Sequence, residues 1–216
     1  MTDSTKHDKT PHAASTKKKT KLPFIGGVLV IVLGIAGAAY FTTNNTLERY
    51  NGDGYSMLVP KDFHRTEQDS VAQFTQTDRA DKKAVNETPS PAPAVDGIPP
   101  SSIVVSKQPY SAEMPKSAMQ AQLTDAAIST FAKDYVSGLN GASVSNLVKK
   151  NADHQGLSAK QYSFDITRDS KVLAQRHQLY VFGDKEYYQI DVLVQGDGSR
   201  EKLPVDKILA SLDIKK

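Results

Sequence analysis

An uninterrupted apolar run over residues 22–41 constrains this chain more than any other feature of its sequence. An α-helix of that length spans about 30 Å, which is the thickness of the hydrocarbon core of a bilayer. Tyr40 and Phe41 close the run, and aromatic side chains are common at membrane interfaces. We therefore predict a single transmembrane helix over 22–41.

A lysine cluster stands at the other end of this run. Lys17, Lys18, Lys19 and Lys21 precede it, and residues 1–22 carry a net charge of +4 although the whole chain carries only +3. The positive-inside bias places this end in the cytoplasm and the C-terminal bulk outside the cell membrane. These lysines are expected to act as a topology signal and to bind anionic lipid headgroups. Residues 1–21 contain too few apolar side chains to fold, so we expect a disordered cytoplasmic tail.

Two further interpretations of the apolar run remain open. Ala36-Gly37-Ala38 resembles a signal-peptidase site, but the leader and the apolar run are both longer than in a usual signal peptide, which favours a retained anchor. Gly34 and Ala38 form a small-xxx-small pattern that would suit a helix–helix contact. Because glycine is common in membrane helices, the pattern alone does not establish such a contact.

The rest of the chain is expected to be a spacer over 42–48 and one extracytoplasmic domain over 49–216. This part is nearly neutral, which argues against a nucleic-acid partner. The chain has no cysteine, which excludes disulfides and thiolate metal sites. Five prolines fall within 78–100, and we interpret this stretch as an extended, solvated insertion within the domain.

Periodicity predicts the elements of the domain. Alternating apolar residues indicate strands, and one apolar stripe with three- and four-residue steps indicates a helix over 125–140, with Thr124 as N-cap and Gly141 at its end. A short helix is expected over 205–212. The expected strands are 54–60, 71–75, 102–107, 143–149, 161–167, 171–182 and 187–195. Tight turns between consecutive strands imply an α+β fold, an α/β/α sandwich around a mostly antiparallel sheet.

The order of these elements resembles a known family. Gly54-Tyr-Ser-Met-Leu-Val-Pro60, followed by Phe63, resembles the start of PsbP-like (Mog1/PsbP-fold) domains. Tyr187-Tyr188-Gln-Ile-Asp-Val and the final Ile208-Leu-Ala-Ser-Leu212 resemble the end of such domains. The chain departs from the pattern at Phe63, where a tryptophan is common, and in its Pro-rich insertion. The resemblance implies a mostly non-enzymatic accessory or binding module, and it transfers no functional residue.

No catalytic, cofactor or metal motif stands out in the sequence. His64, His154 and His177 are isolated and lack the spacing of metal ligands. The carboxylate pairs Asp165 with Asp169 and Glu186 with Asp191 are most simply solvated side chains near turns. We therefore expect no enzyme activity and no cofactor.

Three functional hypotheses follow. The leading one is a membrane-anchored extracytoplasmic module that binds a protein or another cell-envelope partner. The second is an envelope-acting hydrolase, which requires one of the three histidines to meet a carboxylate or serine. The third is a structural component that oligomerises through its membrane helix.

Overall fold

Long strands joined by tight turns make up most of the folded domain. The computed structural model describes residues 47–77, 90–196 and 203–215. The strands are β1 (Leu47–Asn51), β2 (Tyr55–Pro60), β3 (Phe63–Gln68), β4 (Val71–Gln76), β5 (Ser102–Pro109), β6 (Ser143–His154), β7 (Leu157–Arg168), β8 (Lys171–Phe182), β9 (Glu186–Gln195) and β10 (Asp213–Ile214). The helices are α2 (Lys116–Gln122), α3 (Asp125–Ser137) and α4 (Val205–Ala210).

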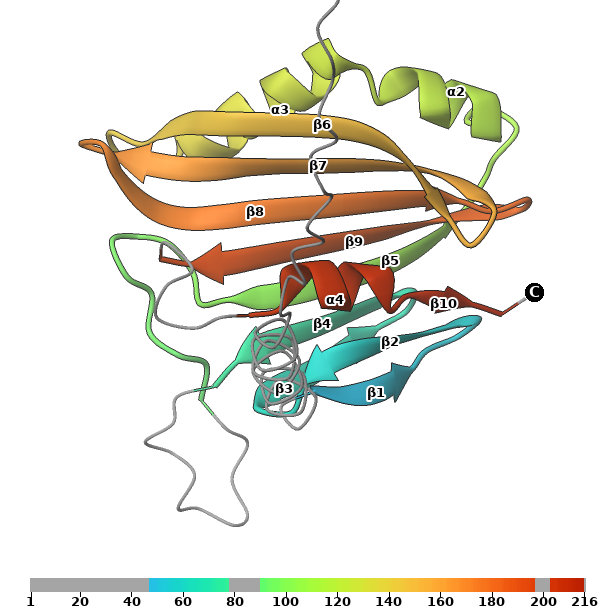
Figure 1. Ribbon diagram of the computed structural model, residues 1–216, viewed down its shortest axis with the longest axis horizontal. Coiled ribbons are helices and arrows are strands. Elements are labelled where there is room, and N and C mark those ends of the chain that lie inside the picture. Colours follow the sequence, from blue (N-terminus) through green and yellow to red (C-terminus); the bar gives the residue numbers. More distant parts are fainter. Residues whose placement is uncertain (1–46, 78–89, 197–202, 216) are drawn as a thin grey trace, which may run out of the picture. The chain divides into compact units, whose positions relative to one another are not determined.

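Two antiparallel sheets form from these strands (Figure 1). The large sheet has seven strands in the order β3-β4-β5-β9-β8-β7-β6, and the small sheet has three in the order β1-β2-β10. Every pairing in both sheets is antiparallel. The prediction of a mostly antiparallel sheet is therefore confirmed.

Different elements cover the two faces of the large sheet. Helix α3 packs against β6 and β7 on one face, and α2 precedes it there. On the other face the small sheet and α4 pack together over β4, β5, β8 and β9 and enclose the largest apolar cluster. Helices thus occur in both outer layers, as predicted, but the second layer also contains a sheet that the periodicity did not predict.

The predicted side-chain alternation is confirmed in the two strands where it is most regular. Tyr162, Phe164 and Ile166 of β7 are buried on the α3 side. Tyr188, Ile190, Val192 and Val194 of β9 are buried under the small sheet and α4. Because successive side chains of a strand point to opposite faces, each of these runs supplies one layer of the core.

Helix α3 begins as predicted and ends earlier than predicted. The Thr124 hydroxyl accepts a hydrogen bond from the Ala127 N–H at 3.2 Å, which satisfies one free amide of the first turn. The helix stops at Ser137 with Gly138 as its C-cap. Leu139 and Ala142 then form turns that lead into β6, and Gly141 has a φ of +70°, which a glycine adopts without strain.

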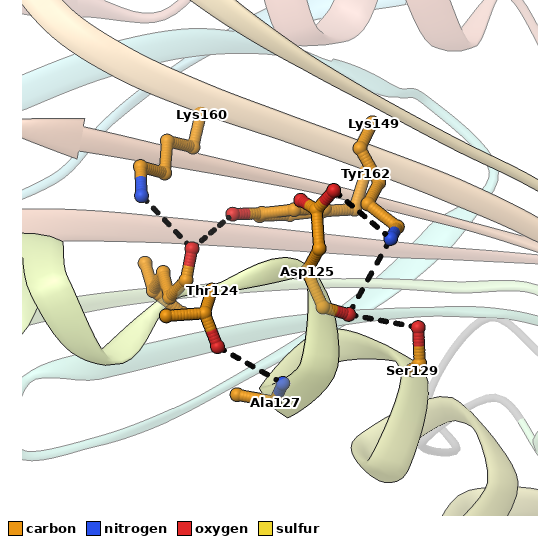
Figure 2. A network of polar contacts seen from close by, with 8 residues as sticks. Thr124, Asp125, Ala127, Ser129, Lys149, Lys160 and Tyr162 are labelled. Carbon is orange, nitrogen blue, oxygen red and sulfur yellow. Dashed lines mark hydrogen bonds and ion pairs between the residues drawn. The ribbon is translucent and has the colours of Figure 1, made fainter.

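The link between α2 and α3 is held on the large sheet by lysines and a tyrosine (Figure 2). Lys160 Nζ and Tyr162 Oη both donate to the Leu123 carbonyl oxygen, at 2.8 and 3.0 Å. Lys160 also donates to the Gln120 carbonyl at 2.9 Å, so it satisfies carbonyl oxygens at the C-terminal end of α2. Lys149 Nζ lies 3.4 Å from the Asp125 carboxylate. These contacts fix the position of both helices over β6 and β7.

Several elements differ from the sequence prediction. Strand β1 begins at Leu47, whose side chain is buried, so the folded part starts within the expected spacer. Strands β1, β3 and β10 and helix α2 were not predicted, because each is short or mainly polar. The stretch expected to be solvated over 78–100 is described from residue 90, and there Ile98 is fully buried. That expectation is wrong at Ile98, which packs with Ala132 and Phe164.

The predicted membrane segment lies outside the described residues, as do the tail and most of the spacer. Across the described ranges, no helix is both long and apolar enough to cross a membrane.

Candidate binding cleft

The structure describes some of the residues singled out in the sequence and places them on different elements. Lys17, Lys18, Lys19, Lys21, Gly34 and Ala38 lie outside the described residues. The three histidines lie on three different strands, with His64 on β3, His154 on β6 and His177 on β8. His154 Nε2 is 2.7 Å from the Leu212 carbonyl oxygen, and burial lowers the pKa of His177.

Three of the four carboxylates singled out in the sequence have hydrogen-bond or ion-pair partners in the structure. Glu186 accepts a hydrogen bond from Tyr188, on the small-sheet side of β9. Asp191 points to the α3 side, where it binds Arg176. Asp165 accepts hydrogen bonds from Asn146 and Gln175. These carboxylates therefore serve as hydrogen-bond acceptors within the sheet, and Glu186 and Asp191 face opposite layers.

A cleft that no sequence motif predicted lies where the small sheet meets β3. It consists of two neighbouring pockets that share Tyr50 as a wall, and we call it the Tyr50 cleft. The first pocket, with a volume of about 210 Å³, is lined by Tyr50, Asp53, Tyr55, Glu67, Asp69, Ser70, Val71, Ala72 and Lys107. The second, of about 280 Å³, is lined by Glu48, Arg49, Tyr50, Asn51, Val59, Phe63, Arg65 and Phe74.

Tyr50 is positioned by both sheets. Its ring packs edge-on against Phe74, with centroids 5.0 Å apart, and against Tyr55 at 5.8 Å. Its hydroxyl donates to Glu67 Oε1 on β3. The Arg65 guanidinium carbon lies 4.6 Å from the centroid of the same ring, within the range of a cation–π contact. Burial is the main cause that raises the pKa of Tyr50.

Glu67 and Arg65 form the β3 wall. They are two residues apart on one strand, so their side chains share a face, and Arg65 Nη2 lies 2.6 Å from Glu67 Oε1. Hydrogen bonds from Arg65 and then from Tyr50 lower the pKa of Glu67. Glu67 is thus held as a carboxylate at neutral pH.

Lys107 forms the wall opposite β3 in the first pocket. Its Nζ lies 3.0 Å from Asp53 Oδ2 and 3.4 Å from Glu186 Oε2. Gly54 has a φ of +77°, and a Cβ atom there would lie 3.2 Å from Lys107 Nζ. The glycine-containing turn after β1 therefore allows the lysine to approach the backbone closely.

The two pockets differ in charge. Three carboxylates, from Asp53, Glu67 and Asp69, and one ammonium, from Lys107, line the first. Arg49 and Arg65 face a single carboxylate, from Glu48, in the second. We call them the acidic pocket and the basic pocket. Carboxylates and aromatic rings together favour a cation, so the acidic pocket suits a basic side chain.

A second polar cluster lies buried beneath α3. Arg176 Nε donates to both carboxylate oxygens of Asp191, at 2.9 and 3.1 Å, and Gln178 Nε2 donates to the same carboxylate at 3.0 Å. The Arg176 guanidinium carbon lies 4.0 Å from the centroid of the Tyr135 ring and 4.9 Å from that of Phe131. Phe131 has the spacing of the apolar stripe of α3, yet it is 38% exposed and lies over this cation. The cluster anchors α3 to β8 and β9.

Few local patterns in the sequence indicate either site. Tyr50 and Glu67 are 17 residues apart, and β3 was not predicted. The alternation Phe63, Arg65, Glu67 before the turn at Asp69-Ser70 is the one local sign that these side chains share a face.

Comparison with known proteins identifies the fold. No protein-family model matches the chain, and no curated protein matches it. Among solved structures, the PsbP protein CyanoP of Synechocystis sp. PCC 6803 is similar with a TM-score of 0.52 and 13% identity, over 78% of this chain and 92% of that one. LpqN of Mycobacterium tuberculosis, described as involved in cell envelope biogenesis, is similar with a TM-score of 0.45 and 17% identity. The match covers 82% of this chain and 96% of that one.

The Ran-binding protein Mog1p of Saccharomyces cerevisiae gives a TM-score of 0.43 and 10% identity, over 78% of this chain and 95% of that one. The domain has the PsbP/Mog1 fold, and the resemblance noted in the sequence is confirmed at this level.

Proposed function

We propose that this chain is a membrane-anchored module that binds a protein partner outside the cell membrane through the Tyr50 cleft and catalyses no reaction. The observation that carries the proposal is the cleft itself, in which side chains from β1, β2, β3 and β5 converge on two small charged pockets.

The size of the pockets favours a protein partner over a cofactor or a metabolite. Sites for drug-sized molecules usually have volumes of about 300–1,000 Å³. The two pockets, of about 210 and 280 Å³, fall below that range and suit individual side chains of a partner. Their rim is charged and partly exposed, as is usual in interfaces that form reversibly.

The cleft offers binding groups and no catalytic set. Several of its ionisable side chains are held in ion pairs, Glu67 with Arg65, and Lys107 with Asp53 and with the nearby Glu186. His64 also lies on β3, but its side chain is on the opposite face from those of Arg65 and Glu67. Successive side chains of a strand point to opposite faces, and His64 immediately precedes Arg65. Within the described part of the chain, the hydrogen-bonded histidine is His154, whose partner is a backbone carbonyl.

The location outside the membrane is part of the proposal and rests on the sequence. The apolar run over 22–41 and the lysines that precede it support a cytoplasmic tail, a single crossing and an exported domain. In this arrangement the partner belongs to the cell envelope, the tail contacts the lipid bilayer, and no nucleic acid is involved.

Site-specific photo-crosslinking in intact cells tests this function. A photoreactive residue is introduced into the full chain at Asp69 or Ser70, which line the acidic pocket, or at the exposed Lys150 on β6, at the far edge of the large sheet. We expect light-dependent adducts with one and the same protein from Asp69 and Ser70 and not from Lys150. Equal adducts from all three positions, or none from the cleft, would contradict the proposal.

A further inference from the structure

We infer that the partner binds as an extended segment that adds a strand to the free edge of β3 and inserts a basic side chain into the acidic pocket. This inference rests on the proposed function, since it specifies how the Tyr50 cleft would hold its partner.

Strand β3 is the last strand of the large sheet within the described residues. A terminal strand presents backbone N–H and C=O groups that can pair with another chain. Peptide recognition by strand addition uses these groups for affinity and side-chain pockets for selectivity.

The hydrogen-bond pattern shows which residues of β3 present these groups. The Gln76 N–H donates to the Ser101 carbonyl at 2.9 Å, so Gln76 of β4 directs its backbone toward β5. By alternation, Thr75 and Gln73 direct theirs toward β3, where they lie opposite His64 and Thr66. The backbone groups of Phe63, Arg65 and Glu67 therefore point to the free edge.

The same three residues line the two pockets. Phe63 and Arg65 line the basic pocket, and Glu67 lines the acidic one. Alternate side chains of a strand are about 7 Å apart and share a face. An added strand that pairs with Arg65 and Glu67 would thus direct its own alternate side chains into the cleft, beside Tyr50.

The charge of the acidic pocket sets the chemistry of the inserted side chain. Of its three carboxylates, Asp53 is paired with Lys107 and Glu67 is paired with Arg65 of the basic pocket. Among the described residues, the Asp69 carboxylate is therefore left without a counter-ion. The rings of Tyr50 and Tyr55 add aromatic walls. A lysine or arginine of the partner offsets the excess negative charge, whereas an acidic side chain is repelled.

The opposite edge of the sheet has features that oppose strand addition. Strand β6 is interrupted by an irregularity between Ser145 and Val148, and Asn146 there has a φ of +51°. Lys149 and Lys150 follow on the same strand. Bulges and lysines are the usual means by which edges avoid pairing. This contrast makes β6 a control surface.

The test measures binding of short fluorescent peptides to the full chain in detergent micelles, by fluorescence anisotropy. The peptides alternate threonine and valine, and their central residue is lysine, leucine or glutamate. We expect the lysine peptide to bind about five-fold more tightly than the leucine peptide, since exposed ion pairs contribute modestly, and the glutamate peptide to bind least. This preference should weaken as salt rises from about 50 mM to about 500 mM.

Two variants at position 65 separate the contribution of the backbone N–H to peptide binding from that of the side chain. Arg65→Pro removes an N–H that points to the free edge, and a proline is tolerated at such an edge position. Arg65→Thr removes the same side chain and keeps the N–H. Because both variants lose the Arg65 side chain, the comparison between them isolates the N–H. We expect Arg65→Pro to bind the lysine peptide at least about ten-fold more weakly than Arg65→Thr does.

A chemical variant of the peptide covers the case in which Arg65→Pro does not fold, as judged by thermal melting. Methylation of one alternating set of peptide amides should abolish binding to the unchanged chain, and methylation of the other set should leave it intact. Equal effects of both sets, equal losses with the two Arg65 variants, or no preference for lysine would each overturn the inference.

The outcomes also separate this inference from the proposed function. If Asp69 and Ser70 crosslink to a protein in cells while the peptides fail these criteria, the cleft binds a partner in another way. If the full chain instead dimerises and Arg65→Pro dissociates the dimer, the edge pairs with a second copy, and the inferred partner is wrong.

Discussion

Replacement of Asp191 by alanine should destabilise the folded domain strongly, because it leaves the Arg176 guanidinium without its counter-ion. Both side chains are largely enclosed, with 14% of Arg176 and 13% of Asp191 exposed. The change also removes the acceptor of Gln178, whose side chain is buried. An unpaired buried charge lowers the stability of the folded state by far more than the intact ion pair adds to that stability.

The magnitude follows from this burial. Removal of one partner of a buried ion pair costs about 3–5 kcal/mol. The rings of Tyr135 and Phe131 remain over the cation and offset part of that cost, so we expect the lower end, about 3 kcal/mol. For a domain of this size, each kcal/mol lowers Tm by about 2–4 °C, which gives a fall of about 6–12 °C.

Thermal unfolding followed by circular dichroism measures this fall at neutral pH. The matched control is the double variant Arg176→Met with Asp191→Leu, which replaces both charges by apolar side chains and should lose much less than Asp191→Ala alone. A fall of less than about 2 °C for Asp191→Ala would refute the reasoning. So would a double variant as unstable as the single one, because the cost would then not come from an unpaired charge.

Three further predictions concern the cleft, the helices and the loop. The lowered pKa of Glu67 means that its contribution to stability is present above its unfolded-state pKa and is lost as pH falls through the folded-state value. The difference in Tm between the unchanged chain and Glu67→Gln should therefore shrink as the solution is made acidic, and a constant difference would contradict this. Lys160→Met removes two hydrogen bonds to carbonyls at the end of α2 and should lower the free energy of unfolding by about 1–3 kcal/mol. Amide hydrogen exchange in α2 and α3 should become faster, and unchanged exchange there would contradict the anchoring role. Ile98→Ala should lower the free energy of unfolding by about 2–4 kcal/mol, because Ile98 is fully buried. Val95→Ala, at a side chain that is 51% exposed, should lower it by less than about 0.5 kcal/mol. Similar denaturant midpoints for the two variants would contradict the packing of this loop.

The predictions that succeeded depend on local patterns. Tyr162, Phe164 and Ile166 alternate with polar residues, and that alternation alone places them on one face of a strand. Thr124 before an apolar stripe marks the beginning of a helix, because its hydroxyl can accept from an amide in the first turn. Both signals arise from neighbours in the chain.

The predictions that failed depended on contacts between distant segments. Ile98 lies in a Pro-rich stretch that looks solvated, and it is buried because α3 and β7 provide a place for it. Phe131 fits the apolar stripe of α3, yet it covers Arg176 of β8. Strand β3 is mostly polar and exposed, so its pairing with β4 rather than its composition makes it a strand.

By itself, the sequence determined the antiparallel character of the large sheet and the beginning of the helix at Asp125, because alternation, caps and tight turns act between residues close together in the chain. Only the tertiary structure decided what the domain presents to a partner. The Tyr50 cleft exists because a small sheet built from both ends of the domain packs Tyr50 against Glu67 and Arg65. Such contacts depend on how distant strands pack, and no local periodicity records that packing.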